Sequence, residues 1–144
     1  MGCSLKINNL LNIIRSVHKS TIIIVTDYSK FRMYNEDAII SNYLFKYDIH
    51  KLKDYNFIIN KIEYLNYVKF NLRKIGINYI VVDKHDGYNI ISEYKEDNNY
   101  YEIYLKRSKI YYKRMKIINK IRKVKDIEKI NLIKEKLNYY GLYG

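Results

Sequence analysis

The sequence predicts an α/β domain with a mixed sheet flanked by helices, followed by a basic helical extension. Two β-branched runs, residues 21–26 and 77–83, are typical of strands that are buried on both faces. Apolar side chains at helical spacing precede the first run, separate the two runs and recur through the last third of the chain. This alternation of helices and strands favours helices layered on a sheet.

The first part of the chain predicts a helix, two strands and a second helix. A stripe of apolar side chains at helical spacing indicates an amphipathic helix over residues 5–18. After the first buried strand and a turn, residues 30–34 alternate basic and apolar side chains, which is typical of a short, half-exposed strand. We expect Asn35 to cap a helix with Glu36 and Asp37 in its first turn, where the helix dipole favours negative charge.

The middle of the chain repeats this alternation. Short strands are expected at residues 47–50 and 55–59, and the helix that follows ends at Gly76, a residue typical of helix C-termini. Residues 77–83 then form the second buried strand. A Gly-containing turn leads to residues 88–94, which are expected to form its hairpin partner.

A polar segment, residues 95–99, divides the predicted domain (residues 1–97) from the extension (residues 98–144). Apolar side chains three, four or seven positions apart predict a long helix over most of this extension. The apolar seam is not a clean heptad, which argues against a long coiled coil. A break near Asp126, acting as a second N-cap, would make the extension a helical hairpin.

The net charge of +12 is concentrated in one segment. Residues 100–125 contain ten basic side chains and one acid, whereas residues 1–99 contain 14 basic and 11 acidic side chains. Such an asymmetry suggests a polyanionic partner, and we expect nucleic acid. The alternative is an ordinary solvated face in a Lys-rich chain.

Helical spacing brings several of these cations onto one face, where interleaved tyrosines are expected to stack on bases. The candidate nucleic-acid-binding residues in this helix are Lys106, Arg107, Lys109, Lys113, Arg114, Lys116 and Lys120.

Little in the sequence supports catalysis or metal binding. His85 and Asp86 form a possible catalytic pair, but a simple turn is the favoured interpretation. Asp27, Asp48 and Asp83 lie near predicted strand ends, as nuclease metal ligands do, yet no Asp/Glu-x-Lys motif accompanies them. We therefore expect a protein without enzymatic activity, cofactor or metal.

Other features bear on compartment and origin. Cys3 is the single cysteine, which excludes an internal disulfide and a zinc site built from several cysteines. No apolar run approaches the roughly 18 residues that would span a membrane, and no signal peptide is recognisable. We expect a cytoplasmic protein. The absence of Pro and the 18 Tyr are typical of an AT-rich genome.

Residues 21–38 resemble the N-terminal mismatch-recognition domain, domain I, of the MutS mismatch-repair proteins. A buried strand, a turn and an aromatic-containing tripeptide precede the run Met33-Tyr34-Asn35-Glu36-Asp37-Ala38. The corresponding run in the family is typically Gly-Asp-Phe-Tyr-Glu-Met-Phe-x-Glu-Asp-Ala. The helix ending at Gly76 and the strand at residues 79–83 are similar to that domain's second helix–strand unit.

The resemblance covers residues 5–83 and implies a small mixed sheet flanked by helices. It extends to short stand-alone proteins of AT-rich bacteria and mobile elements, in which a similar core with Asn-Glu-Asp-Ala is followed by a basic C-terminal helix. The ATPase parts of MutS are missing, since no Gly-x-x-x-x-Gly-Lys-Ser/Thr run is present.

The residues that read a mismatch are also replaced. In the family, a Phe and a Glu two residues later contact the mispaired base. Alignment on the Glu-Asp-Ala block places Lys30 at the Phe position, Phe31 at the Tyr position and Arg32 at the Glu position. The resemblance thus implies a turn at Lys30, Phe31 and Arg32 that contacts phosphates and does not read bases.

These observations predict a non-enzymatic DNA-binding protein. An alternative is a protein-interaction or dimerisation module in which the extension buries its apolar seam, acting as a regulatory or mobile-element accessory factor. A small nuclease is the third hypothesis.

Overall fold

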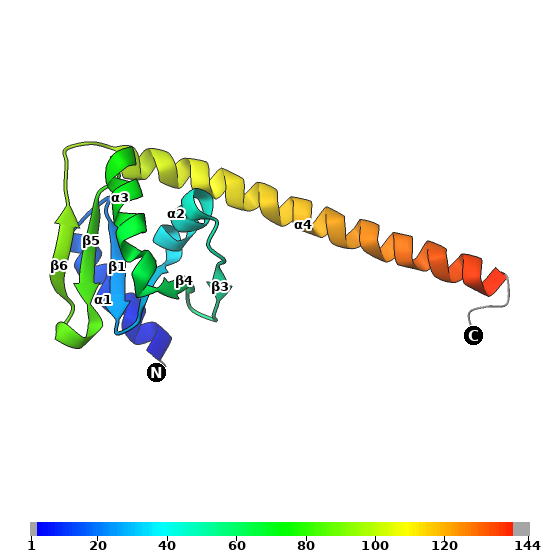
Figure 1. The fold of residues 1–144 in the computed structure, drawn as a ribbon, viewed down its shortest axis with the longest axis horizontal. Coiled ribbons are helices and arrows are strands. Elements are labelled where there is room, and N and C mark those ends of the chain that lie inside the picture. Colours follow the sequence, from blue (N-terminus) through cyan, green and yellow to red (C-terminus); the bar gives the residue numbers. More distant parts are fainter. Residues whose placement is uncertain (1–2, 140–144) are drawn as a thin grey trace. The chain divides into compact units, whose positions relative to one another are not determined.

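The structure, a computed structural model, describes residues 3–139 and is a mixed α/β fold with a long C-terminal helix (Figure 1). One six-stranded sheet has the order β3-β4-β2-β1-β5-β6. The predicted mixed sheet flanked by helices and the predicted C-terminal helix are confirmed at this level.

The strands are β1 (Ile22–Asp27), β2 (Lys30–Tyr34), β3 (His50–Lys51), β4 (Asn56–Lys61), β5 (Tyr79–Asp83) and β6 (Asn89–Tyr94). The helices are α1 (Cys3–Val17), α2 (Asn35–Phe45), α3 (Leu65–Ile75) and α4 (Tyr100–Tyr139), with short 3-10 turns η1 (Ile62–Tyr64) and η2 (Lys84–Asp86).

The two β-branched runs form the centre of the sheet. β1 and β5 are parallel neighbours in the register Ile23↔Ile80 and Val25↔Val82, and every other neighbouring pair of strands is antiparallel. These four side chains are at most 2% exposed. Continuous β-branched sequence suits such strands because both faces must be apolar.

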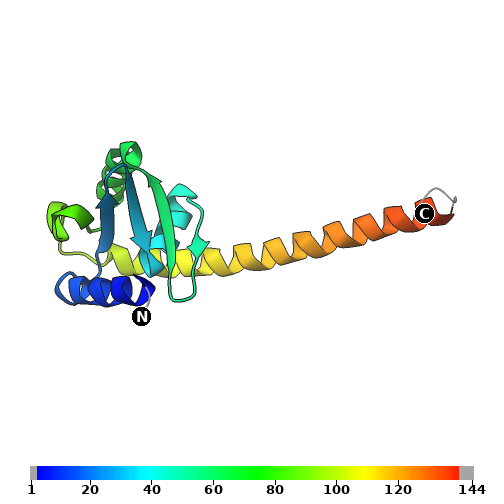
Figure 2. The ribbon, with the colours of Figure 1, turned by 90° about the horizontal axis from the view of Figure 1, so that it is seen from below.

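Helices cover both faces of this sheet. Figure 2 shows α1 along one face and α3 along the other. One core cluster joins Phe31, Ile58 and Leu72 with Leu105 from the first turns of α4. The other cluster lies on the α1 face, and its buried members are Leu11, Ile23, Val25, Tyr34, Ile80 and Val82.

A buried carboxylate joins four of these elements. Asp37, 1% exposed, accepts hydrogen bonds from Arg15 Nη2 on α1 (2.6 Å), the Ile23 backbone N–H in β1 (2.9 Å) and the Tyr101 hydroxyl in α4 (2.8 Å). Arg15 also donates to the Thr21 carbonyl (3.0 Å). The buried charge is therefore paired and hydrogen-bonded, as such burial requires.

Burial and ion pairing have opposite effects on the pKa values of Asp37 and Arg15. Burial raises the pKa of Asp37, and the bonds from Arg15, Ile23 and Tyr101 oppose that rise. Burial acts to lower the pKa of Arg15, but Asp37, Tyr101 and Glu36 together outweigh it and the pKa is raised overall. Burial, with Asp37 nearby, also raises the pKa of Tyr101, which keeps its hydroxyl protonated as a donor.

The start of α2 differs from the prediction for Asn35. Tyr34 occupies the cap position without a side-chain cap bond, and Asn35 lies inside the helix with a φ of +52°. The Asn35 side chain instead donates to Asn8 Oδ1 on α1 (3.3 Å) and accepts from the Asn56 backbone N–H in β4 (3.2 Å). Its amide therefore links α2 to α1 and β4, and does not cap its own helix.

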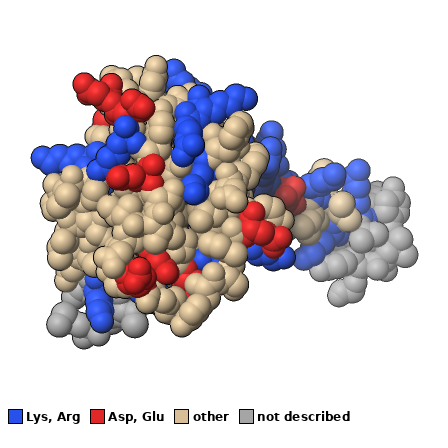
Figure 3. All heavy atoms as spheres, turned by 60° about the vertical axis from the view of Figure 1, so that its left-hand side comes forward, with Lys and Arg blue, Asp and Glu red and all other residues tan. Residues whose placement is uncertain are grey.

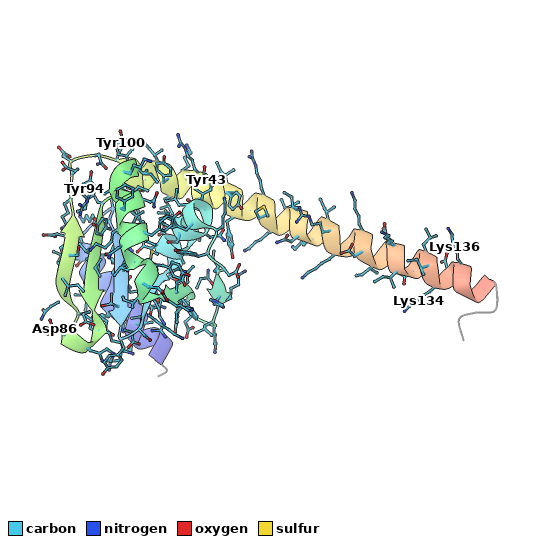
Figure 4. All side chains as sticks on the ribbon, viewed as in Figure 1. Tyr43, Asp86, Tyr94, Tyr100, Lys134 and Lys136 are labelled. Atoms are coloured by element: carbon cyan, nitrogen blue, oxygen red, sulfur yellow. The ribbon has the colours of Figure 1, made fainter. Side chains whose placement is uncertain are left out.

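The glycine at the end of α3 behaves as the sequence predicts. Gly76 has a φ of +97° and ends the helix, with its N–H bonded to the Leu72 carbonyl. A Cβ at this position would lie 2.8 Å from Tyr100 Cδ2, so glycine also makes room for the start of α4. Figure 4 labels Tyr100 at that end of the helix.

The extension differs from the prediction in one way. α4 is one helix through Tyr139, so the predicted break near Asp126 is wrong. No Pro or Gly interrupts the helix, and a lone Asp costs little inside it.

The start of α4 belongs to the first compact unit, which reaches Lys109, and Tyr101, Leu105 and Ser108 are buried in it. The second unit begins at Ile110. The sequence also predicts a frayed tail over residues 139–144, and all of these residues but Tyr139 lie outside the described part of the chain.

Replacement of Asp37 should test the buried network. Asp37→Ala removes the partner of Arg15 and leaves the Ile23 N–H without an acceptor, so we expect the free energy of unfolding to fall by about 3 kcal/mol or more. Urea denaturation followed by circular dichroism measures this loss.

Glu36→Ala is the matched control, since Glu36 is exposed beside Asp37 and pairs with Lys109 at the surface. Its cost should stay below about 1 kcal/mol. Equal losses for the two variants would contradict the role given to Asp37.

Candidate nucleic-acid interface

The Lys30-Phe31-Arg32 segment is divided between the two faces of the sheet. It forms the start of β2, where successive side chains point to opposite faces. Phe31 is 0% exposed and belongs to the core under α2, α3 and α4. Phe31 therefore has no surface for nucleic acid, and we remove it from the candidate interface. Lys30 is exposed and Arg32 is half-buried on the α1 side.

Arg32 is engaged in a charged cluster at the end of β1. Arg32 Nη1 lies 3.0 Å from Asp27 Oδ2, and Lys84 Nζ lies 3.6 Å from the same oxygen. The other Asp27 oxygen, Oδ1, lies 2.5 Å from His85 Nε2. His85 also stacks on Tyr28, with ring centroids 3.6 Å apart. The carboxylate holds these basic groups together and neutralises part of their charge.

This cluster identifies a partner that the sequence did not suggest. His85 pairs with Asp27, 58 positions away. Asp86 lies with His85 in the short turn η2, as the favoured interpretation of the sequence has it, and is not part of the cluster. The parallel register of β1 and β5 is what indicates this pairing, because it places Thr26 opposite Asp83 and so brings the ends of the two strands together.

The cations of the first turns of α4 belong to the compact domain. Lys106, Arg107 and Lys109 are all exposed. Lys109 Nζ lies 3.3 Å from Glu36 Oε2, and the Arg107 guanidinium lies 5.1 Å from the Tyr104 ring centroid. These turns pack with Phe31 on one sheet face, whereas Arg32 lines the α1 face. Within the first unit, the structure therefore does not bring Lys106, Arg107 and Lys109 onto the same sheet face as Arg32.

The part of α4 that belongs to the second unit contains most of the extension's basic side chains. Residues 110–136 hold ten basic and three acidic side chains. Lys113, Arg114, Lys116 and Lys120 are exposed. Figure 4 labels Lys134 and Lys136 on the last turns. By contrast, Lys, Arg, Asp and Glu are mixed over the domain face visible in Figure 3.

The tyrosines of α4 are not equivalent stacking surfaces. Tyr101 is 5% exposed and bonded to Asp37, so it has no face available for a base. Tyr111 and Tyr112 are half-buried in the second unit, and Lys116 Nζ lies 4.3 Å from the Tyr112 ring centroid. Only part of the predicted aromatic interleaving is therefore accessible.

The three aspartates that the sequence analysis considers as possible metal ligands are divided between two places. Asp27 and Asp83 lie on neighbouring strand ends, and Asp48 lies in the loop before β3. Among the described residues, no three His, Cys, Asp or Glu side chains are grouped so that they hold a metal ion. Within residues 3–139, no helix has the length and apolar character to cross a membrane.

Titration of Asp27 should report on its cluster. The hydrogen bond from His85, followed by that from Arg32, lowers the pKa of Asp27 below its ordinary value of 3.8. The folded state then binds fewer protons than the unfolded state, so the cluster stabilises the fold above about pH 3.8. That contribution is lost as the pH falls through the folded pKa.

NMR titration of the side-chain carboxyl carbon measures this value. His85→Ala should move the pKa of Asp27 up toward 3.8, and Lys84→Ala should move it less, because His85 is the larger cause. A larger shift in the Lys84 variant would contradict this assignment.

In the first unit, the cations at Arg32 and those on the first turns of α4 lie on different faces of the sheet. No protein-family model matches the chain, and no curated protein matches it. The similarity to MutS domain I therefore remains a hypothesis based on residues 5–83.

Proposed function

We propose that this chain is a non-enzymatic DNA-binding protein whose helix α4 contacts the phosphate backbone. The observation that supports this most directly is the excess of basic over acidic side chains in residues 110–136. Ordinary exposed helices interleave charges of both signs, and a helix with a strong excess of cations suits a polyanion.

The spacing of these cations also favours a backbone contact. Lys113, Lys116 and Lys120 are three and four positions apart, so they project from one side of the helix. They span about 10 Å at 1.5 Å per residue, a length along which duplex DNA presents several phosphates. Lysine contacts phosphate as a point charge, which gives affinity without sequence readout.

As part of the same proposal, the first domain is related to MutS domain I. Phe31 is buried and Arg32 pairs with Asp27, so neither side chain takes the role of the Phe or the Glu that contacts a mispaired base in the family. The proposed DNA binding is therefore one without base readout. Exposed Lys30 stays in the proposed interface as a backbone contact. We expect preference for a distorted or branched site to come from shape, since no base-reading pair is present.

Salt dependence should test the α4 contact. The protein should bind duplex DNA at about 50 mM salt and lose most of that affinity by about 200 mM, because each neutralised phosphate releases counterions. Replacing Lys113, Lys116 and Lys120 together with Gln should reduce the slope of log K against log salt by up to about three. Fluorescence anisotropy over a salt series measures the slope.

The matched control replaces Lys53, Lys61 and Lys74, three exposed lysines of the domain, with Gln. This variant has the same net charge but should leave the slope nearly unchanged. No binding at low salt, or equal slopes for both triple variants, would contradict the proposal.

A second candidate function is self-association through α4. Ile117, Ile121 and Val124 are 59%, 49% and 53% exposed and lie at i, i+4 and i+7 on one side of the helix. Exposed apolar side chains in such a row are typical of a surface that meets another helix. This side of the helix is next to the one that presents Lys113, Lys116 and Lys120.

Light scattering after size exclusion separates the candidates. Self-association through the apolar row should give a dimer that persists at about 1 M salt, where screening has removed most surface electrostatics. Ile121→Asp should then return the monomer, whereas the exposed-site control Asn119→Asp should not. A monomer at every salt concentration would exclude this candidate and leave the DNA-binding proposal in place.

A further inference from the structure

A groove lies beside α1 on the sheet face opposite α3. It has a volume of about 1000 Å³, at the upper end for small-ligand sites. Its walls come from α1, from β2 and β4, and from the segments around β3 and η2. α1 lies along that face (Figure 2), so the groove is separate from the first turns of α4, which pack on the other face.

Aromatic rings form the floor of this groove. Tyr34 and Tyr55 meet edge to face with centroids 5.5 Å apart, and Tyr55 lies 5.8 Å from Phe57. His50 packs on Phe57 at 5.2 Å. Tyr55 and Phe57 are half-buried, so they keep part of their surface accessible. Tyr34 is buried, and burial raises its pKa to about 12, which keeps its hydroxyl neutral.

The basic side chains around this floor come from different elements. Lys6 lies on α1, Arg32 on β2, His50 on β3 and Lys84 on η2, and the described residues that line the groove include no Asp or Glu. Asp27 pairs with Arg32 and Lys84, and it neutralises only one positive charge of the group. An aromatic floor with separated cations complements planar rings linked by several anionic groups.

We propose that this groove binds the unpaired nucleotides of a single nucleic-acid strand. The bases stack on Tyr55 and Phe57, and successive phosphates lie near Lys84, Arg32 and Lys6. Stacking does not require a particular base, so the groove has little sequence preference. Several cations at separate points suit the repeated phosphates of a strand better than a free mononucleotide. The proposal is independent of α4, because none of the groove's residues belongs to that helix.

The test measures binding of a labelled oligothymidylate of about eight nucleotides to the full chain at low salt. The measurement is repeated with the triple Gln variant of Lys113, Lys116 and Lys120, in which the α4 contribution is weakened. Tyr55→Leu keeps apolar bulk but removes the ring, and we expect single-strand binding about tenfold weaker in that background. Lys84→Gln should reduce the single-strand salt slope by about 0.7.

The matched controls are Tyr67→Leu and Lys74→Gln, both exposed on α3 at the other face of the sheet. They should leave single-strand binding unchanged. Cross-linking with 5-iododeoxyuridine in the oligonucleotide should label residues 50–59, around Tyr55 and Phe57.

Three results would overturn the proposal. The first is equal affinity of the groove variants and the controls for the single strand. The second is cross-linking confined to α4, which leaves the proposed function intact but not the groove. The third is competition by thymidine monophosphate at the same concentration as the oligonucleotide, which would make the ligand a free nucleotide. Loss of duplex binding alone in the triple Gln variant affects only the role of α4.

Discussion

The buried carboxylate of Asp37 is the constraint on which the rest of the structure depends. A charge at 1% exposure is stable only if fixed donors surround it, and its donors come from α1, β1 and α4. The carboxylate itself lies in the first turn of α2. One side chain thus requires three helices and the central strand to be in place together, which makes the first turns of α4 part of the domain.

This constraint also explains how the two sheet faces differ. Tyr101 and Leu105 complete the core over Phe31, so that face is closed by α2, α3 and α4. The other face has only α1, tied to the same carboxylate through Arg15. A single helix does not cover all of β2 and β4, and the aromatic and basic side chains there line a groove. The closed face stabilises the fold, while the open face is available for binding.

The sequence predicts the elements of this fold better than their connections. β2 has the expected bounds, β1 and β5 lie within a residue or two of the β-branched runs, and Gly76 ends its helix. Periodicity reports which side chains are buried locally, so these features were accessible.

The role of Asp37 was not accessible from the sequence. The helix dipole alone explains why an acid is found in the first turn of a helix. Nothing in the sequence around Asp37 indicates that Arg15 and Tyr101 are its partners. For the same reason the interleaved pattern assigned Tyr101, with the other tyrosines of the helix, to stacking, and the resemblance to MutS domain I placed Phe31 in the interface. The groove combines Lys6, Arg32, His50 and Lys84 from distant positions, which only the fold brings together.

The change in α4 at Ile110 follows from the same packing. Up to Ser108 its side chains alternate between the core and solvent, so cations are restricted to the outer positions. Among the described residues from Ile110 onward, which belong to the second unit, no side chain is fully buried. The cations and the apolar row of Ile117, Ile121 and Val124 occupy neighbouring sides of that segment. A helix can present these sides to different partners, so DNA contact and self-association through α4 are compatible functions of one element.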